Sequence, residues 1–141
     1  MEQDAAGRPT TDADAEIVRL FEATTLTAFP HEAHVRVAWW YLQHAALPDA
    51  MGQFMRGIRR FAAAKGASAK YHETVTVAWV LLIAQRVGET PTLPWGDFAA
   101  CHSDLFSQPS AMERYYEPAT LASDRARRGF VMPDRLAPPR G

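Results

Sequence analysis

The chain contains one cysteine, Cys101, among its 141 residues. An intrachain disulfide is therefore excluded, and with it the class of small secreted proteins that disulfides hold together. Long apolar runs are also missing, since the longest, from Val77 to Ala84, is far shorter than the roughly 20 residues that span a bilayer. The acidic, polar start of the chain has no apolar segment of signal-peptide length. These absences predict a cytoplasmic protein with no contact with a membrane.

A surplus of positive charge is absent as well. Lys and Arg number 15 against 16 Asp and Glu, which leaves a formal net charge of −1 at pH 7. Proteins that bind nucleic acid or anionic membranes by general electrostatic attraction carry an excess of Lys and Arg, so we expect no nucleic-acid partner. No glycine-rich phosphate loop is present, because Gly52 and Gly57 fall inside an expected helix, and nucleotide-dependent chemistry is not expected either.

Apolar residues, by contrast, are plentiful and recur at helical spacing. They make up 48% of the chain, and a chain of this length can bury a core without disulfides or metal. The valines and threonines after position 71 could by propensity form a strand, but the length of that apolar segment and the lack of strand partners favour a buried helix. The expected main helices are 14–25, 31–46, 49–65 and 71–87.

The predicted fold class is all-α, a single-domain helical bundle of about four main helices with short C-terminal helices. Prolines divide the sequence after Gly88, where the short helices are expected near 95–102, 110–116 and 123–128. Residues 1–11 lack apolar spacing and predict a flexible arm, while 133–141, with three prolines, predict an extended tail. The helical domain is expected over 12–132.

Three of the five histidines stand at or near the start of an expected helix: His31 and His34 in the second, His72 in the fourth. In an up-and-down bundle the second and fourth helices are parallel, so their first turns lie at the same end. A helix N-terminus disfavours the imidazolium ion, and neutral imidazole is the form that ligates metals. The sequence therefore predicts one pocket in which His31, His34 and His72 hold a divalent transition metal such as zinc, iron, nickel or copper.

Acidic and hydroxyl side chains accompany these histidines. Glu32 and Glu73 each follow a histidine directly, so either would complete the ligand set or act as a general base beside a bound water. Tyr71 and the neighbouring threonines add hydroxyls that can hold a substrate or orient a ligand. Glu73 and Tyr71 are therefore the candidate catalytic residues, and a metal-free pocket that uses His72 and Glu73 is a variant of the same hypothesis.

The same residues also have a purely structural explanation. Histidines at a helix start can cap backbone groups, and Glu73 can interact with the helix dipole. The spacing lacks the two histidines, four residues apart, that mark a zinc-protease helix. The alternative function is a non-catalytic helical module, natural as a homodimer, that binds a small ligand or a protein partner in an apolar groove.

Two arginine clusters, at 56–60 and at 125–128, are open to two interpretations. Each could bind an anionic substrate or a partner carboxylate, although a solvated helix face is the more usual explanation.

Several motifs resemble those of a group of small bacterial all-helical hypothetical proteins. They are FPHEAH at 29–34, GIRRF at 57–61 and YHETVT at 71–76, with Tyr115–Tyr116 and Pro133–Asp134 further along. The resemblance extends over about residues 17–134 and implies that these motifs belong together. It implies no activity, substrate, cofactor or partner.

Overall fold

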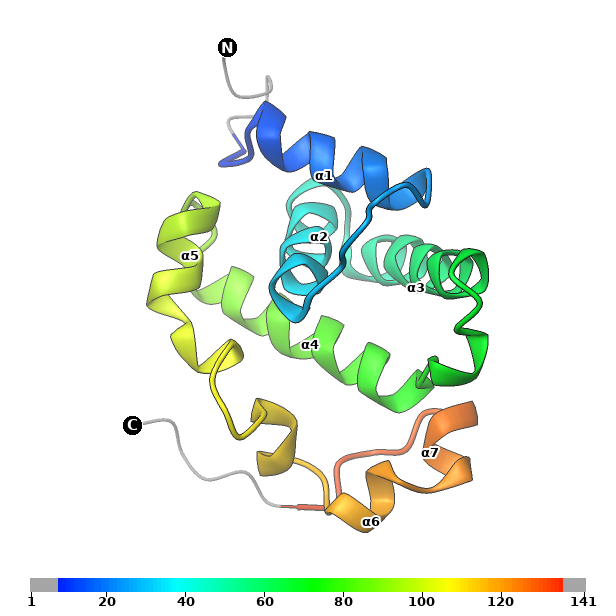
Figure 1. Cartoon of the computed structure of the whole chain (residues 1–141). Helices are drawn as coiled ribbons and strands as arrows, with labels where there is room; N and C mark the ends of the chain where they lie inside the picture. Colours follow the sequence, from blue (N-terminus) through cyan, green and yellow to red (C-terminus); the bar gives the residue numbers. More distant parts are fainter. Residues whose placement is uncertain (1–7, 136–141) are drawn as a thin grey trace.

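The computed structural model describes residues 8–135, which form helices and no strand (Figure 1). The α-helices are α1 (Asp12–Glu22), α2 (His31–His44), α3 (Leu47–Ala64), α4 (Glu73–Glu89), α5 (Trp95–Cys101), α6 (Pro118–Leu121) and α7 (Asp124–Arg128). Short 3-10 helices are η1 (Ser68–Lys70), η2 (Ser103–Leu105) and η3 (Ala111–Arg114). The predicted all-α, single-domain fold is confirmed. None of the helices within 8–135 is long and apolar enough to cross a membrane.

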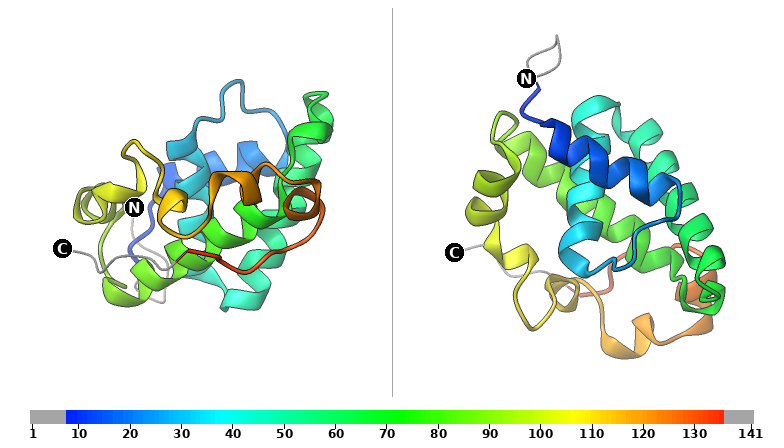
Figure 2. Two further views of the ribbon diagram at one scale, coloured as in Figure 1. Left: turned by 90° about the horizontal axis from the view of Figure 1, so that it is seen from below. Right: turned by 45° about the horizontal axis from the view of Figure 1, so that its top comes forward.

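α2 is the central helix and packs against α1, α3 and α4. α6 and α7 lie beneath α4 in Figure 1, with α7 in contact with α4. The right-hand view of Figure 2 shows that α2 and α4 both begin at the lower end of the molecule and run upward, while α3 runs down along the right side. The first turns of α2 and α4 therefore lie at the same end, which is the placement that an up-and-down bundle gives.

Close packing of α1 against α3 depends on a glycine. Gly57 is buried in α3, and a Cβ added there would lie 2.4 Å from Cε2 of Phe21, whose ring is itself fully buried. Glycine inside a helix costs about 1 kcal/mol relative to alanine. It is used here because any side chain would collide with the Phe21 ring.

The start of α1 is closed by a capping box. Thr11 accepts a hydrogen bond from the Asp14 N–H, and the Asp14 carboxylate accepts one from the Thr11 N–H in return. Asp14 is 2% exposed and also accepts two hydrogen bonds from the guanidinium of Arg36, at 2.8 and 2.5 Å. The cap of α1 is thereby joined to α2.

Seven of the eight boundaries predicted for the four main helices differ from the observed ones, by one to three residues, and two of these differences have a clear cause. α3 begins at Leu47 rather than Asp49, with Pro48 in its first turn, where a missing N–H costs nothing. α4 does not end at Val87 as predicted but continues through Gly88 to Glu89, and the N–H of its C-cap, Thr90, donates to the carbonyl of Arg86 in the last turn. Gly88 is exposed, and a Cβ added there would meet nothing within 4 Å, so this position lies at the open surface of the last turn.

Packing extends beyond the predicted domain limits at both ends. In the predicted arm Thr10 is buried, and its hydroxyl lies 3.0 Å from Nε2 of His44. In the predicted tail the Asp134 carboxylate accepts hydrogen bonds from the Glu117 N–H and the Thr120 hydroxyl. The rest of the predicted arm and tail, 1–7 and 136–141, lies outside the described residues.

Candidate functional site

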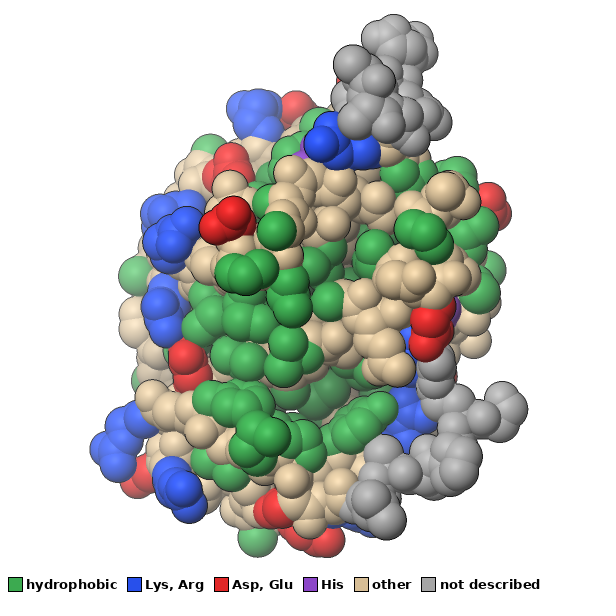
Figure 3. Space-filling view, turned by 180° about the vertical axis from the view of Figure 1, so that it is seen from behind, with side chains coloured by type: hydrophobic (Ala, Val, Ile, Leu, Met, Phe, Trp, Pro, Cys, Tyr) green, Lys and Arg blue, Asp and Glu red, His purple; other side chains and the backbone are tan. Residues whose placement is uncertain are grey.

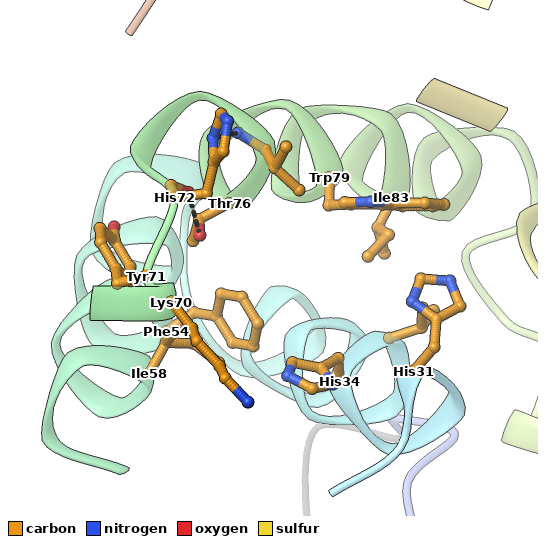
Figure 4. Close-up of a pocket in the computed structure, with 12 residues that line it drawn as sticks. His31, His34, Phe54, Ile58, Lys70, Tyr71, His72, Thr76, Trp79 and Ile83 are labelled. Carbon is orange, nitrogen blue, oxygen red and sulfur yellow. Dashed lines mark hydrogen bonds between the residues drawn. The ribbon is translucent and has the colours of Figure 1, made fainter. Parts of the chain in front are cut away.

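A cavity of about 310 Å³ lies between the first turns of α2 and α4 and the middle of α3 (Figure 4). His31, His34 and His72 all line it. Its apolar walls come from three helices, namely Val35 on α2, Phe54 and Ile58 on α3, and Val75, Trp79 and Ile83 on α4. Its other polar residues are Lys70, Tyr71 and Thr76.

His72 uses both ring nitrogens to hold the fold together. It is the N-cap of α4, because its Nδ1 accepts a hydrogen bond of 3.1 Å from the Val75 N–H. The proton is therefore on Nε2, which donates to the carbonyl oxygen of Leu121 at 2.7 Å. The ring points away from those of His31 and His34 in Figure 4. His72 thus has no free lone pair for a metal or a substrate.

His34 presents an unpaired nitrogen to the cavity. Its Nδ1–H donates to the Pro30 carbonyl at 3.0 Å, which leaves the lone pair on Nε2. That nitrogen has no hydrogen-bond partner among residues 8–135. The ring stacks on Phe29 at a centroid distance of 3.8 Å, and burial lowers the pKa of His34 below its ordinary value. His34 is therefore a neutral hydrogen-bond acceptor at pH 7.

His31 occupies a more exposed place on the same helix. Its Nε2–H donates to the Leu105 carbonyl at 2.9 Å, so its lone pair is on Nδ1. The ring meets Trp79 edge to face, at a centroid distance of 4.6 Å. The bond to Leu105 joins the start of α2 to η2 and fixes the orientation of the ring.

These bonds do not assemble the predicted metal site. In the described part of the chain no three His, Cys, Asp or Glu side chains come together as a metal ion requires. His31, His34 and His72 share the cavity, but His72 cannot act as the third ligand while it caps α4 and bonds to Leu121. The residues present therefore do not fit the predicted three-histidine metal site, and binding of a transition metal stays a prediction.

Glu73, the candidate base, lies outside the residues that line the cavity. Its Oε1 accepts hydrogen bonds from the Tyr71 hydroxyl at 2.7 Å and from Nη2 of Arg59 at 2.8 Å. Burial and the bond to Glu73 together raise the pKa of Tyr71 to about 12. Tyr71 is therefore a protonated donor turned toward Glu73, and the catalytic roles predicted for the two residues stay predictions. Glu32 is exposed and does not line the cavity either.

Lys70 is the cavity residue that the sequence analysis missed. It is exposed, and among the described residues that line the cavity it is the only one with a permanent charge. Figure 4 shows its side chain extending along the edge of the cavity toward His34. Its place in the sequence, directly before Tyr71, was the available signal.

A second, apolar groove of about 320 Å³ lies between α4, η3 and the segment after α7. Three of its large hydrophobic side chains are exposed, namely Leu81, Phe130 and Met132. Hydrophobic side chains gather around a hollow on the rear face of the molecule (Figure 3). A protein partner at such a groove, including the second copy expected from the sequence, stays a prediction.

Comparison with known proteins gives no matching family model, no matching curated protein and no matching solved structure. The chemistry of the cavity is therefore the basis for assigning a function. Among residues 8–135, the polar groups of the cavity that have no partner are two imidazole lone pairs and one ammonium group, beside apolar walls.

Proposed function

We propose that this protein binds a small, largely apolar molecule in the cavity between α2, α3 and α4. Apolar walls with a few precisely placed polar groups are typical of small-molecule sites. The volume of about 310 Å³ is at the lower end of the range of about 300–1,000 Å³ for such sites, which suits a molecule of one or two rings. The observation that carries the proposal is the unpaired Nε2 of neutral His34 inside this apolar enclosure.

The hydrogen-bonding groups of the cavity define the polar part of the ligand. His34 and His31 each offer a lone pair, so the ligand is expected to donate from a hydroxyl or an N–H group. The hydroxyls of Tyr71 and Thr76 already donate, to Glu73 and to the His72 carbonyl. Because no carboxylate lines the cavity among the described residues, a cationic ligand is disfavoured.

Ligand binding is proposed in preference to the metal-dependent chemistry predicted from the sequence. The bonds of His72 and the ion pair of Glu73 hold both residues in structural contacts. They therefore contribute to the architecture of the site, and we propose His34, which lines the cavity, as the residue that contacts the ligand.

We also propose that the protein acts in the cytoplasm. Cys101 is an exposed free thiol, and exposed unpaired thiols persist in the reducing cytoplasm. Subcellular fractionation of the native protein tests this location directly.

Calorimetric titration with two probes tests the proposed binding site. One is a naphthalenediol, and the other is dimethylnaphthalene, which has the same rings but no hydrogen-bond donor. The diol is expected to bind more tightly, and His34→Leu is expected to weaken only the diol, by up to about tenfold for one neutral hydrogen bond. Ile58→Trp fills the cavity and is expected to abolish binding of both probes. His44→Ala, outside the cavity, serves as the control. Unchanged binding in Ile58→Trp would contradict the proposal.

A further inference from the structure

An arginine-rich cleft of about 330 Å³ adjoins the cavity. Its lining residues are Arg59 of α3, Arg127 and Arg128 of α7, Ser68, Ala69, Tyr71 and Glu73. Tyr71 lines the cavity as well, so the two hollows meet at this residue. Lys and Arg side chains gather along the left edge of the molecule in Figure 3, the edge on which α3 and α7 lie.

The charges in the cleft do not balance. Three guanidinium groups face one carboxylate, that of Glu73, which is paired with Arg59 at 2.8 Å. Arg127 donates from Nη1 to the Ala69 carbonyl at 3.2 Å, a neutral acceptor. Arg128 has no ion-pair or hydrogen-bond partner among residues 8–135. Two positive charges are thus left without a counter-charge, and they converge on a concave surface, unlike those on an ordinary solvated helix face.

We propose that this cleft binds a phosphate group, and that the ligand of the cavity is an apolar phosphate monoester whose body lies beyond Tyr71. The inference rests on the proposed function. A phosphate monoester carries close to two negative charges at pH 7, which matches the two unpaired guanidinium groups. Planar guanidinium groups bind phosphate oxygens through paired N–H bonds, and Lys70, on the cavity side, adds a further cation.

The structure also gives Glu73 a role in this site. Its carboxylate neutralises Arg59 and accepts the Tyr71 hydroxyl, and so competes with any phosphate for both donors. Glu73→Gln removes the negative charge but retains an oxygen that can accept from Tyr71. The variant is therefore expected to bind the phosphate ester more tightly and the neutral diol unchanged. A general base at this position would not produce that pattern.

The test compares a naphthalenediol with its own monophosphate ester by calorimetric titration of the full chain at fixed ionic strength. The ester retains one hydroxyl for His34 and adds only the phosphate. It is expected to bind at least about tenfold more tightly than the diol, the effect of new hydrogen bonds between charged groups. The double variant Arg127→Gln/Arg128→Gln is expected to lose this gain and to bind the diol normally. Arg125→Gln, in the same helix but outside the cleft, is the matched control and should keep the gain.

Each outcome separates the two proposals. The phosphate site is overturned, and the proposed function left intact, if the diol binds but the ester binds no more tightly. The same holds if the higher affinity of the ester survives in the double variant. Unchanged binding of the ester in the cavity-filling Ile58→Trp variant would mean that the phosphate is not attached to a cavity ligand, and also overturns this inference. If neither probe binds, both proposals fail. Thermal unfolding by circular dichroism verifies that each variant is folded.

Discussion

The ring of His72 donates a hydrogen bond of 2.7 Å from Nε2 to the carbonyl oxygen of Leu121, a residue 49 positions further along the chain. The same ring caps α4 through Nδ1. The helix that forms one wall of the cavity is thus capped and tied to α6 by a single side chain. This arrangement assigns His72 to the architecture of the site.

His72→Ala is expected to lower the free energy of unfolding by about 2 kcal/mol, because it removes an N-cap and leaves a carbonyl without its donor. His72→Asn, a good N-cap, is expected to restore about half of that loss. Urea denaturation measures both variants. If His72 held a metal instead, treating the parent protein with a chelator would reproduce the loss, and elemental analysis would find the ion in the parent and not in His72→Ala.

The contact between Phe21 and Gly57 predicts opposite effects for the same substitution at two helical glycines. Gly57→Ala places a methyl group 2.4 Å from the Phe21 ring and is expected to destabilise the protein by about 1–3 kcal/mol, as overpacking does. Gly88→Ala meets nothing within 4 Å and is expected to stabilise it by up to about 1 kcal/mol through helix propensity. Equal effects in thermal denaturation would show that α1 can move away from α3.

The helix predictions show what periodicity can and cannot determine. Apolar spacing predicted α2 almost residue for residue, since α2 contacts three other helices and its pattern reflects that burial. α4 was predicted to end at Val87 but continues through Gly88, because one exposed glycine costs a helix only about 1 kcal/mol. The segment around Ala111 was expected to be an ordinary short helix and forms the 3-10 helix η3.

The site was predictable as a location but not as a set of bonds. Topology alone brought His31, His34 and His72 to one end of the molecule. The partners of His31 and His72 are backbone carbonyls 74 and 49 residues away, at Leu105 and Leu121. Those carbonyls are in short C-terminal elements whose sequence carries little periodicity. Their positions decide which imidazole nitrogens remain free, so the hydrogen-bond partners of the histidines could not be predicted from the spacing.

α1 and α3 end in the same hydrogen-bond pattern, and this predicts a further pair of variants. Thr24 has a φ of 58° and Gly66 a φ of 69°, and the next residue in each case donates to a carbonyl five positions back. The left-handed conformation costs a threonine about 1–2 kcal/mol. Thr24→Gly is therefore expected to stabilise the protein by up to about 1 kcal/mol, after the greater freedom of glycine in the unfolded chain is counted. Gly66→Thr should destabilise it by a similar amount, and a loss of stability in Thr24→Gly would contradict the argument.

Burial of His34 predicts how ligand binding depends on pH. Its pKa in the folded protein is lowered from 6.5, chiefly by desolvation, so the unfolded chain binds this proton more readily than the folded one. The contribution of His34 to the free energy of unfolding is therefore fully present above pH 6.5, and it is lost as the pH drops below 6.5 toward the pKa of the folded protein.

Affinity for the naphthalenediol should follow the protonation of His34 in the folded protein, because the imidazolium has no lone pair to offer the hydroxyl. An NMR titration should give His34 a midpoint below 6.5, and calorimetry should show diol affinity falling around that midpoint. In His34→Gln the amide oxygen accepts a hydrogen bond at any pH, so this affinity should become independent of pH across the same range. A His34 midpoint above 6.5, or the same pH dependence in His34→Gln, would exclude His34 as the acceptor.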